Sequence, residues 1–102
     1  MAFSLRFTNQ AKADLADLLR DPSPAQRLRA VHTLGCLERD PRHPGLHTHP
    51  YSQLSGPNQQ RVYEAYAQNR SPTPLRVFWS YGPGGDEITI VAITAHVQAS
   101  PS

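Results

Sequence analysis

The stretch EITIVAITAHV, residues 87–97, is a nearly continuous apolar run with a histidine near its end. Its isoleucine, threonine and valine side chains are β-branched and favour a strand. A strand without polar alternation is typical of the interior of a sheet that is covered on at least one face. Residues 87–97 are therefore predicted to form a central strand, with the other strands of the chain beside it.

Four further segments have the pattern of strands. Residues 3–7, FSLRF, alternate between apolar and polar side chains, as a half-buried strand does. The most β-prone stretch is LRVFWSY, residues 75–81, which the turn GPGGD connects to residues 87–97. QRVYEAYAQ, residues 60–68, also alternates, and the short YSQL, residues 51–54, precedes it across the turn SGPN.

Two helices are predicted between the first strand and the other four. Residues 11–20 carry apolar side chains at helical spacing, and Thr8 or Asn9 can cap them. After a break at DPSP the helix restarts, with Ser23 as the expected N-cap and Pro24 at the first helical position. The stripes expected to face the core are Ala11, Leu15, Leu18 and Leu19 in the first helix and Leu28, Val31, Leu34 and Leu37 in the second, whereas Lys12, Asp14 and Asp17 are expected to point to solvent.

The element order is therefore β-α-α-β-β-β-β. Two N-terminal helices packed on one face of a mostly antiparallel sheet make an α+β fold of two layers. The other face of the sheet then stays partly open. It carries polar and aromatic side chains, which makes it the expected place of a binding site.

The composition sets limits on the domain organisation and the location. The chain has 102 residues, enough for one small core, and we expect a single domain over residues 1–97 with a flexible tail at 98–102. Its single cysteine, Cys36, excludes an internal disulfide and suits a reducing compartment. Neither a secretory signal nor an apolar run of membrane-spanning length is present. The expected location is the cytoplasm, with no membrane involved.

PRHPGLHTHPYSQL, residues 41–54, holds three of the five histidines of the chain. A metal site, a catalytic loop and a polar connector are three interpretations of such a stretch. His47 and His49 point to one side of an extended segment, His43 precedes them by four residues, and zinc accepts three imidazoles. No cysteine pair accompanies these histidines, and prolines rather than a rigid element carry them. The sequence therefore favours a site without a metal.

The ordered set of elements resembles the RelE/ParE toxin superfamily over about residues 3–97. The pieces that carry the resemblance are the opening strand running into NQAKADLADLL, the second helix ending in LGCLERDPRHPGLHTHPYSQLSG, and the strands RVYEAYAQN, LRVFWSY and ITIVAITAH. The resemblance implies a small toxin that a cognate antitoxin protein neutralises in a toxin–antitoxin hetero-oligomer. RelE-type members cut mRNA on the ribosome without a metal or another cofactor, and ParE-type members inhibit DNA gyrase.

The same resemblance implies a set of functional residues on the open sheet face. The arginine of the fourth strand falls on Arg76, and the histidine at the end of the last strand falls on His96. The position in the loop before the second strand falls within His43, His47 and His49, and Glu64 takes an acidic or polar position on the third strand. The residues expected to contact RNA are Arg42, His49, Arg61 and Tyr81.

These residue types suit RNA cleavage without a metal. The reaction needs a base for the 2′-hydroxyl, a cation for the phosphorane and an acid for the 5′-oxygen. Histidine serves either proton transfer near neutral pH, and the planar fork of an arginine meets two phosphate oxygens.

Other interpretations stay open. The chain can be a ParE-type gyrase inhibitor, or a binding or regulatory protein that keeps the fold without catalysis. Lys12 is its one lysine, whereas the active faces of RelE-type enzymes are often rich in lysine. Arg76 can also simply pair with Glu64 across neighbouring strands, and His96 can be a strand-end histidine bonded to the backbone.

Overall fold

The structure is a computed structural model that describes residues 2–20, 24–66 and 75–94. The elements follow the predicted order, with two short 3-10 helices added. They are β1 (Ser4–Phe7), α1 (Asn9–Leu19), α2 (Pro24–Arg39), η1 (Pro44–Leu46), β2 (His49–Ser55), η2 (Pro57–Gln59), β3 (Arg61–Tyr66), β4 (Arg76–Tyr81) and β5 (Glu87–Thr94).

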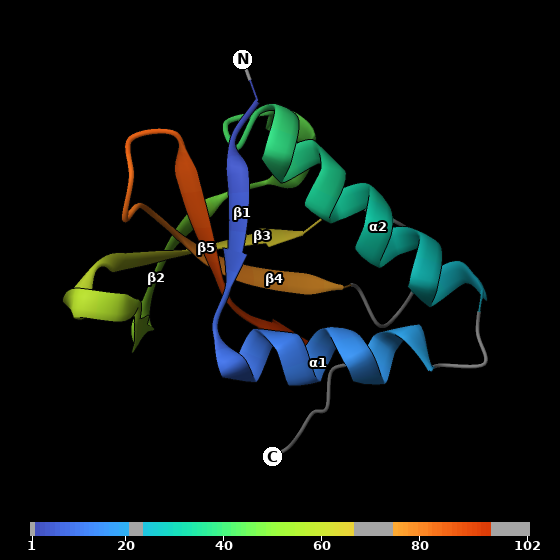
Figure 1. Ribbon diagram of the computed structural model, residues 1–102. Helices are drawn as coiled ribbons and strands as arrows, with labels where there is room; N and C mark the ends of the chain where they lie inside the picture. The colour runs from blue at the N-terminus through green and yellow to red at the C-terminus, as the bar shows by residue number, and fades with distance from the viewer. Residues whose placement is uncertain (1, 21–23, 67–74, 95–102) are drawn as a thin grey trace.

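The five strands form one mixed sheet in the order β1-β5-β4-β3-β2. β1 runs parallel to β5, and the other three strand pairs are antiparallel. β5 therefore lies inside the sheet, between β1 and β4, as its apolar sequence predicts. Figure 1 shows both helices on one side of the sheet, which confirms the predicted α+β fold.

The core lies between the helices and the covered face of the sheet. Side chains alternate between the two faces along the strands, except at a bulge in β5 where Ile90 and Ile93 both point to the core. The buried cluster joins Trp79 and Val77 of β4 and the isoleucines of β5 to Leu18 of α1 and Leu37 of α2. Each large apolar side chain that is buried here contributes about 1.5–3 kcal/mol.

The predicted apolar stripe of α2 is confirmed at Leu37 and wrong at Leu28 and Val31. Ala30, Thr33 and Leu37 are its buried residues, whereas Leu28 is 69% exposed and Val31 is 62% exposed. The residues that α2 buries at positions 30 and 33 are thus smaller than the leucine and valine that it exposes. Leu34 is half-buried against the core, as expected in part.

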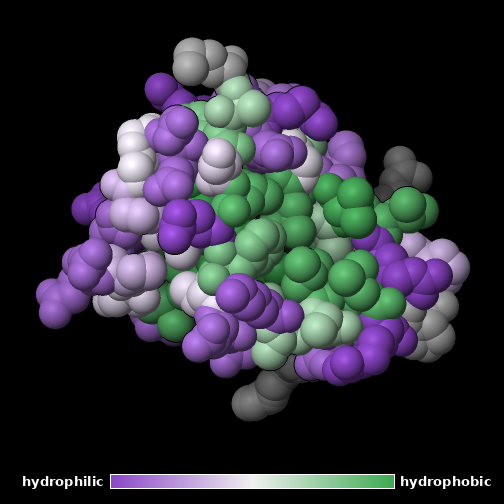
Figure 2. Space-filling model, in the orientation of Figure 1, coloured by the Kyte–Doolittle hydropathy of each residue, from purple (hydrophilic) through white to green (hydrophobic). Residues whose placement is uncertain are grey.

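α1 shows two similar differences from the sequence prediction. Leu19 is 52% exposed, because it is the last residue of the helix. Asp14 does not simply point to solvent, because its Oδ2 accepts a hydrogen bond of 2.9 Å from the backbone N–H of Ile93. Figure 2 shows a broad apolar area on the side of the molecule where α1 and α2 lie.

The predicted helix starts are confirmed where the structure describes them. The Thr8 hydroxyl oxygen accepts a 3.1 Å hydrogen bond from the N–H of Ala11 and caps α1. Pro24 is the first residue of α2, and the proposed cap Ser23 lies outside the described residues. Within the described part of the chain, neither helix is long and apolar enough to cross a membrane.

The strand bounds differ most at β2. This strand begins at His49, two residues earlier than predicted. Because β2 is an edge strand, it tolerates Pro50, which lacks the N–H that an interior strand would need. The predicted ends of the strands at residues 67–68 and 95–97 lie outside the described residues.

Candidate functional site

The open face of the sheet carries a carboxylate between a histidine and an arginine side chain. His49 of β2 and Glu64 of β3 are register partners and point to the same face. Glu64 Oε1 lies 2.6 Å from His49 Nε2, and Glu64 Oε2 accepts a hydrogen bond from Arg76 Nε. The structure thus brings together three of the residues predicted from the sequence.

Burial makes this arrangement more than a surface ion pair. The side chain of Glu64 is 7% exposed, while those of His49 and Arg76 are 48% and 38% exposed. A buried carboxylate is tolerated when cations and hydrogen-bond donors compensate it. Glu64 therefore holds the two half-exposed side chains in place at the surface of the open face.

Arg76 has donors left for a further anion. Its Nε bonds to Glu64, and its guanidinium lies over the buried ring of Phe78, with 5.2 Å between Cζ and the ring centroid. Guanidinium groups carry two terminal amino groups in addition to Nε. The aromatic contact and the Nε bond fix the plane of the fork from which these amino groups project.

His49 faces hydrogen-bond acceptors on both sides of its ring. Its Nδ1 lies 3.1 Å from the backbone oxygen of His47, and its Nε2 faces the carboxylate of Glu64. A carbonyl oxygen only accepts, so Nδ1–H is the donor in that contact. A ring with hydrogen on both nitrogens would donate in both contacts.

The histidine-rich loop places its three histidines differently. His43 Nδ1 accepts a 2.9 Å hydrogen bond from the N–H of Gly45 and caps η1. His47 takes up a left-handed conformation (φ 50°) at the end of η1, which histidine adopts more readily than most residues. The turn at His47 starts β2 two residues later and so puts His49 in register with Glu64.

Tyr66 joins the histidines on this face, and the sequence alone did not single it out. Its ring stacks on His47 with centroids 5.5 Å apart and meets the edge of His49 at 6.2 Å. Tyr66 follows Glu64 by two residues in β3, which places both on one face. Its spacing from Glu64 was the signal that could have identified it.

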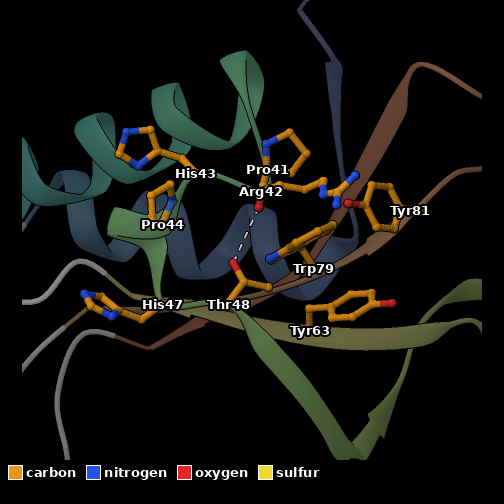
Figure 3. Close-up of a pocket in the computed structure, with 9 residues that line it drawn as sticks. All are labelled: Pro41, Arg42, His43, Pro44, His47, Thr48, Tyr63, Trp79 and Tyr81. Atoms are coloured by element: carbon orange, nitrogen blue, oxygen red, sulfur yellow. Dashed lines mark hydrogen bonds between the residues drawn. The ribbon is translucent and has the colours of Figure 1, made fainter.

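Other predicted residues surround a separate pocket at the end of α2 (Figure 3). This pocket has a volume of about 440 Å³, and Arg42, His43, His47 and Tyr81 lie around it. Its remaining lining residues are Pro41, Pro44, Thr48, Tyr63 and Trp79. Trp79 and Tyr81 are on the helix-covered side of the sheet, since they alternate with Phe78 in β4. Tyr81 and Glu64 therefore point to opposite faces of the sheet.

Tyr81 has an altered acidity in this environment. Burial raises the pKa of its hydroxyl above the ordinary value of 10.0, and the nearby Arg42 guanidinium partly opposes this rise. Figure 3 shows Arg42 reaching toward Tyr81 across the top of Trp79.

Arg61 lies beside a second hollow that adjoins the first. This hollow has a volume of about 270 Å³, and Gln60, Arg61, Tyr63 and Tyr81 line it. Arg61 and Glu64 are three residues apart in β3 and therefore point to opposite faces.

His96 lies outside the described residues, so its position relative to Arg76 stays a sequence-based prediction. Over residues 2–20, 24–66 and 75–94, no three histidine, cysteine or acidic side chains come together in a way that could hold a metal ion. Cys36 lies on α2 with its Sγ 3.6 Å from His32 Nε2, apart from Glu64 and its partners.

Comparisons with known proteins add evidence on the fold. No family model matches the chain, and no curated protein matches it in sequence. The structure is similar to that of the archaeal RelE–RelB complex from Pyrococcus horikoshii, with a TM-score of 0.62 and 19% identity over 97% of this chain and 100% of that one. It is also similar to the protein HP0894 from Helicobacter pylori, with a TM-score of 0.54 and 18% identity over 92% of this chain and 94% of that one. The chain therefore has the fold of the RelE-like toxins.

Proposed function

We propose that the protein is the toxin of a type II toxin–antitoxin pair and that it cleaves mRNA on the ribosome without a metal. The observation that carries the proposal is the position of Glu64 between His49 and Arg76 on the open face of a RelE-like fold. The cytoplasm is the compartment in which such a protein would meet its substrate.

His49 is the proposed general acid, and Glu64 is its positioning residue. Glu64 holds Nε2, so the reactive nitrogen is Nδ1, whose 3.1 Å contact to the His47 carbonyl can be exchanged for a contact to substrate. A carboxylate that holds one imidazole nitrogen orients the ring and stabilises its protonated form, as in the acid–base pairs of hydrolases. Such positioned acids contribute about 10²–10⁴-fold to a rate.

The remaining roles follow from the charge balance of the reaction. The 2′-oxygen attacks phosphorus and gives its proton to a base, and the bond from phosphorus to the 5′-oxygen breaks. The 5′-oxygen takes the proton of His49, and a 2′,3′-cyclic phosphate is left on the other fragment. The terminal amino groups of Arg76 stabilise the extra negative charge of the phosphorane. His96 is the candidate base, as its place in the sequence predicts.

A protein partner is the second element of the proposal. Leu19, Leu28 and Val31 of α1 and α2 are more than half exposed, and exposed apolar side chains on neighbouring helices are typical of an interaction surface. The similar structure from Pyrococcus horikoshii is that of a complex with RelB. Both observations support an antitoxin as the partner of this chain.

The test is to induce the chain in bacteria that lack its antitoxin. The proposal predicts arrested growth and translation, with new mRNA 5′ ends that fall at fixed positions within codons. Normal growth with abundant folded protein would contradict it. If the chain cleaves total RNA in the absence of ribosomes, the proposed reaction stands but its substrate is not limited to mRNA on the ribosome.

A non-catalytic function has one observation in its favour. The Arg76 guanidinium already bonds to Glu64, which is the structural pairing that the sequence leaves open. A ParE-type gyrase inhibitor would arrest replication and induce the DNA-damage response while mRNA stays intact. A regulatory protein without activity would do neither and would still bind its partner.

A further inference from the structure

The two hollows beside Tyr63 and Tyr81 have the same construction. Tyr63 and Tyr81 line both, and each hollow has one arginine, Arg42 in the larger and Arg61 in the smaller. This surface lies on the helix-covered side of the sheet, opposite to Glu64. The residues proposed to take part in RNA cleavage do not include Tyr63, Tyr81, Arg42 or Arg61.

The aromatic rings form a continuous wall between the hollows. Tyr63 and Trp79 stack with centroids 5.0 Å apart, and Tyr81 meets their edges at 5.8 Å and 4.9 Å. Trp79 is buried, while Tyr63 is half-buried and Tyr81 is 39% exposed. The tyrosines therefore offer ring surface to a ligand, and Trp79 fixes them from behind.

Arg42 and Arg61 stand apart from most other arginines of the chain. The guanidinium groups of Arg6, Arg20, Arg29, Arg39 and Arg76 all bond to other side chains. Over the described ranges 2–20, 24–66 and 75–94, no carboxylate lies within ion-pair distance of Arg42 or Arg61. The carboxylate closest in sequence to Arg42 is Asp40, and it accepts a hydrogen bond from the backbone N–H of Arg42 instead.

The pocket also holds a buried donor without a partner. Among the residues that the structure describes, Trp79 Nε1 has no hydrogen-bond partner, and the residue is 1% exposed. Leaving such a donor unpaired costs about 1–3 kcal/mol. Figure 3 shows Trp79 between the loop of residues 41–48 and Tyr63, so its indole ring forms part of the wall of the pocket.

We infer that this surface is a groove for two successive nucleotides of single-stranded RNA. Free arginines beside exposed aromatic rings are the pattern that single-stranded nucleic acid requires, because phosphates meet the arginines while bases stack on the rings. One base occupies the 440 Å³ pocket, beside the rings of Tyr63 and Tyr81, and the next lies in the smaller hollow. The inference rests on the proposed function for its choice of RNA, and it adds a contact surface on the face opposite to Glu64.

Trp79 is the one tryptophan of the chain, so its fluorescence and its single indole N–H resonance report directly on the pocket. The probe is a 2′-O-methylated tetra-adenylate, which cannot be cleaved by attack of a 2′-hydroxyl. The inference predicts that it quenches the fluorescence of the full chain in a saturable way and shifts the indole resonance. Inorganic phosphate and tetraglutamate, which supply charge without bases, should do neither.

Substitutions separate stacking from charge. Tyr81→Leu should weaken binding about tenfold or more. Arg42→Gln and Arg61→Gln should each lower the slope of log affinity against log salt by about 0.7, the contribution of one phosphate on a single strand. The matched control is Arg20→Gln at the end of α1, which should change neither the affinity nor its salt dependence. Circular dichroism confirms that each variant is folded.

The outcomes are distinguishable from those of the proposed function. Quenching that persists in His49→Gln, where cleavage is lost, supports a groove separate from the reaction. If the wild-type chain shows quenching but cuts no mRNA, the proposed endonuclease activity is wrong and the proposed RNA groove is supported. Absence of quenching in the wild-type chain, an equal effect of tetraglutamate, or unchanged salt slopes in both arginine variants would overturn the groove.

Discussion

Glu64 and His49 lie opposite each other on neighbouring antiparallel strands, and their Oε1 and Nε2 atoms are 2.6 Å apart. The carboxylate is buried while the imidazole is half-exposed. The buried Glu64 carboxylate therefore fixes the orientation of the His49 ring at the surface of the open face. It gives His49 the place in the proposed reaction that the sequence divided among three loop histidines.

The first prediction concerns stability. Glu64→Gln should lower the free energy of unfolding by about 1–3 kcal/mol, because it removes the charge that compensates Arg76 and His49. Urea denaturation measures the change. Asp17→Asn is the control, since it breaks the exposed ion pair with Arg20 and should cost less than about 1 kcal/mol. Equal effects of the two substitutions would show that burial of Glu64 adds nothing.

The second prediction concerns the geometry of Arg76. Arg76→Lys keeps the charge but has a single donor nitrogen. It therefore cannot bond to Glu64 through one nitrogen while two others contact the phosphate. Cleavage should fall about 10²-fold in both Arg76→Lys and Arg76→Gln, as mapped by primer extension on a reporter mRNA. Full activity of Arg76→Lys would show that only a point charge is needed.

The third prediction concerns the acidity of Tyr81. Its folded-state pKa is raised above 10.0, first by burial, and Arg42 opposes the rise. Arg42→Gln should therefore raise the pKa of Tyr81 further. NMR of the ring carbon attached to the hydroxyl measures it, with Arg20→Gln as the control. A fall in the pKa on removing Arg42 would contradict the placement of the guanidinium beside the hydroxyl.

The raised pKa of Tyr81 also makes the free energy of unfolding depend on pH. A raised folded-state pKa means that the folded chain holds the Tyr81 proton more tightly than the unfolded chain. The contribution to stability is fully present below about pH 10, and it is lost as the pH rises through the folded-state pKa. In Tyr81→Phe, the free energy of unfolding should fall less above about pH 10 than in the wild type, because position 81 no longer ionises.

The fourth prediction concerns the exposed apolar side chains of α2. Leu28→Ser should change the free energy of unfolding by no more than about 0.5 kcal/mol, because Leu28 is 69% exposed. Leu37→Ala, in the core of the same helix, should cost about 2–5 kcal/mol. Thermal or urea unfolding compares the two variants. If the proposed antitoxin packs on this surface, Leu28→Ser should weaken its binding without loss of fold.

The elements with strong patterns were predictable from the sequence. The apolar run of β5, the alternation of β1 and the cap at Thr8 depend on local chemistry, and the structure places them as expected. The face that α2 buries was not predictable in the same way. Small Ala30 and Thr33 are buried while larger Leu28 is not, and this choice depends on how closely α2 approaches its neighbours.

The candidate site was predictable in its residue types and less so in its geometry. Arg76 and Glu64 were singled out by the resemblance to the RelE/ParE superfamily, but the role of His49 depends on the register of β2. His49 pairs with Glu64 two residues after the left-handed turn at His47, and no local pattern shows this pairing. The aromatic pocket around Trp79 could not be predicted from the sequence either, because it forms where the loop of residues 41–48 folds over β3 and β4.

The most direct test compares His49→Gln with His32→Gln. Both substitutions replace a largely exposed histidine with the same residue, but His32 lies on α2 beside Cys36 and away from Glu64. Each variant is induced without the antitoxin, and mRNA 5′ ends are mapped. The proposed mechanism predicts cleavage at the same positions in the wild type and His32→Gln, and a loss of about 10²-fold or more in His49→Gln. Cleavage by His49→Gln at the wild-type rate would contradict it.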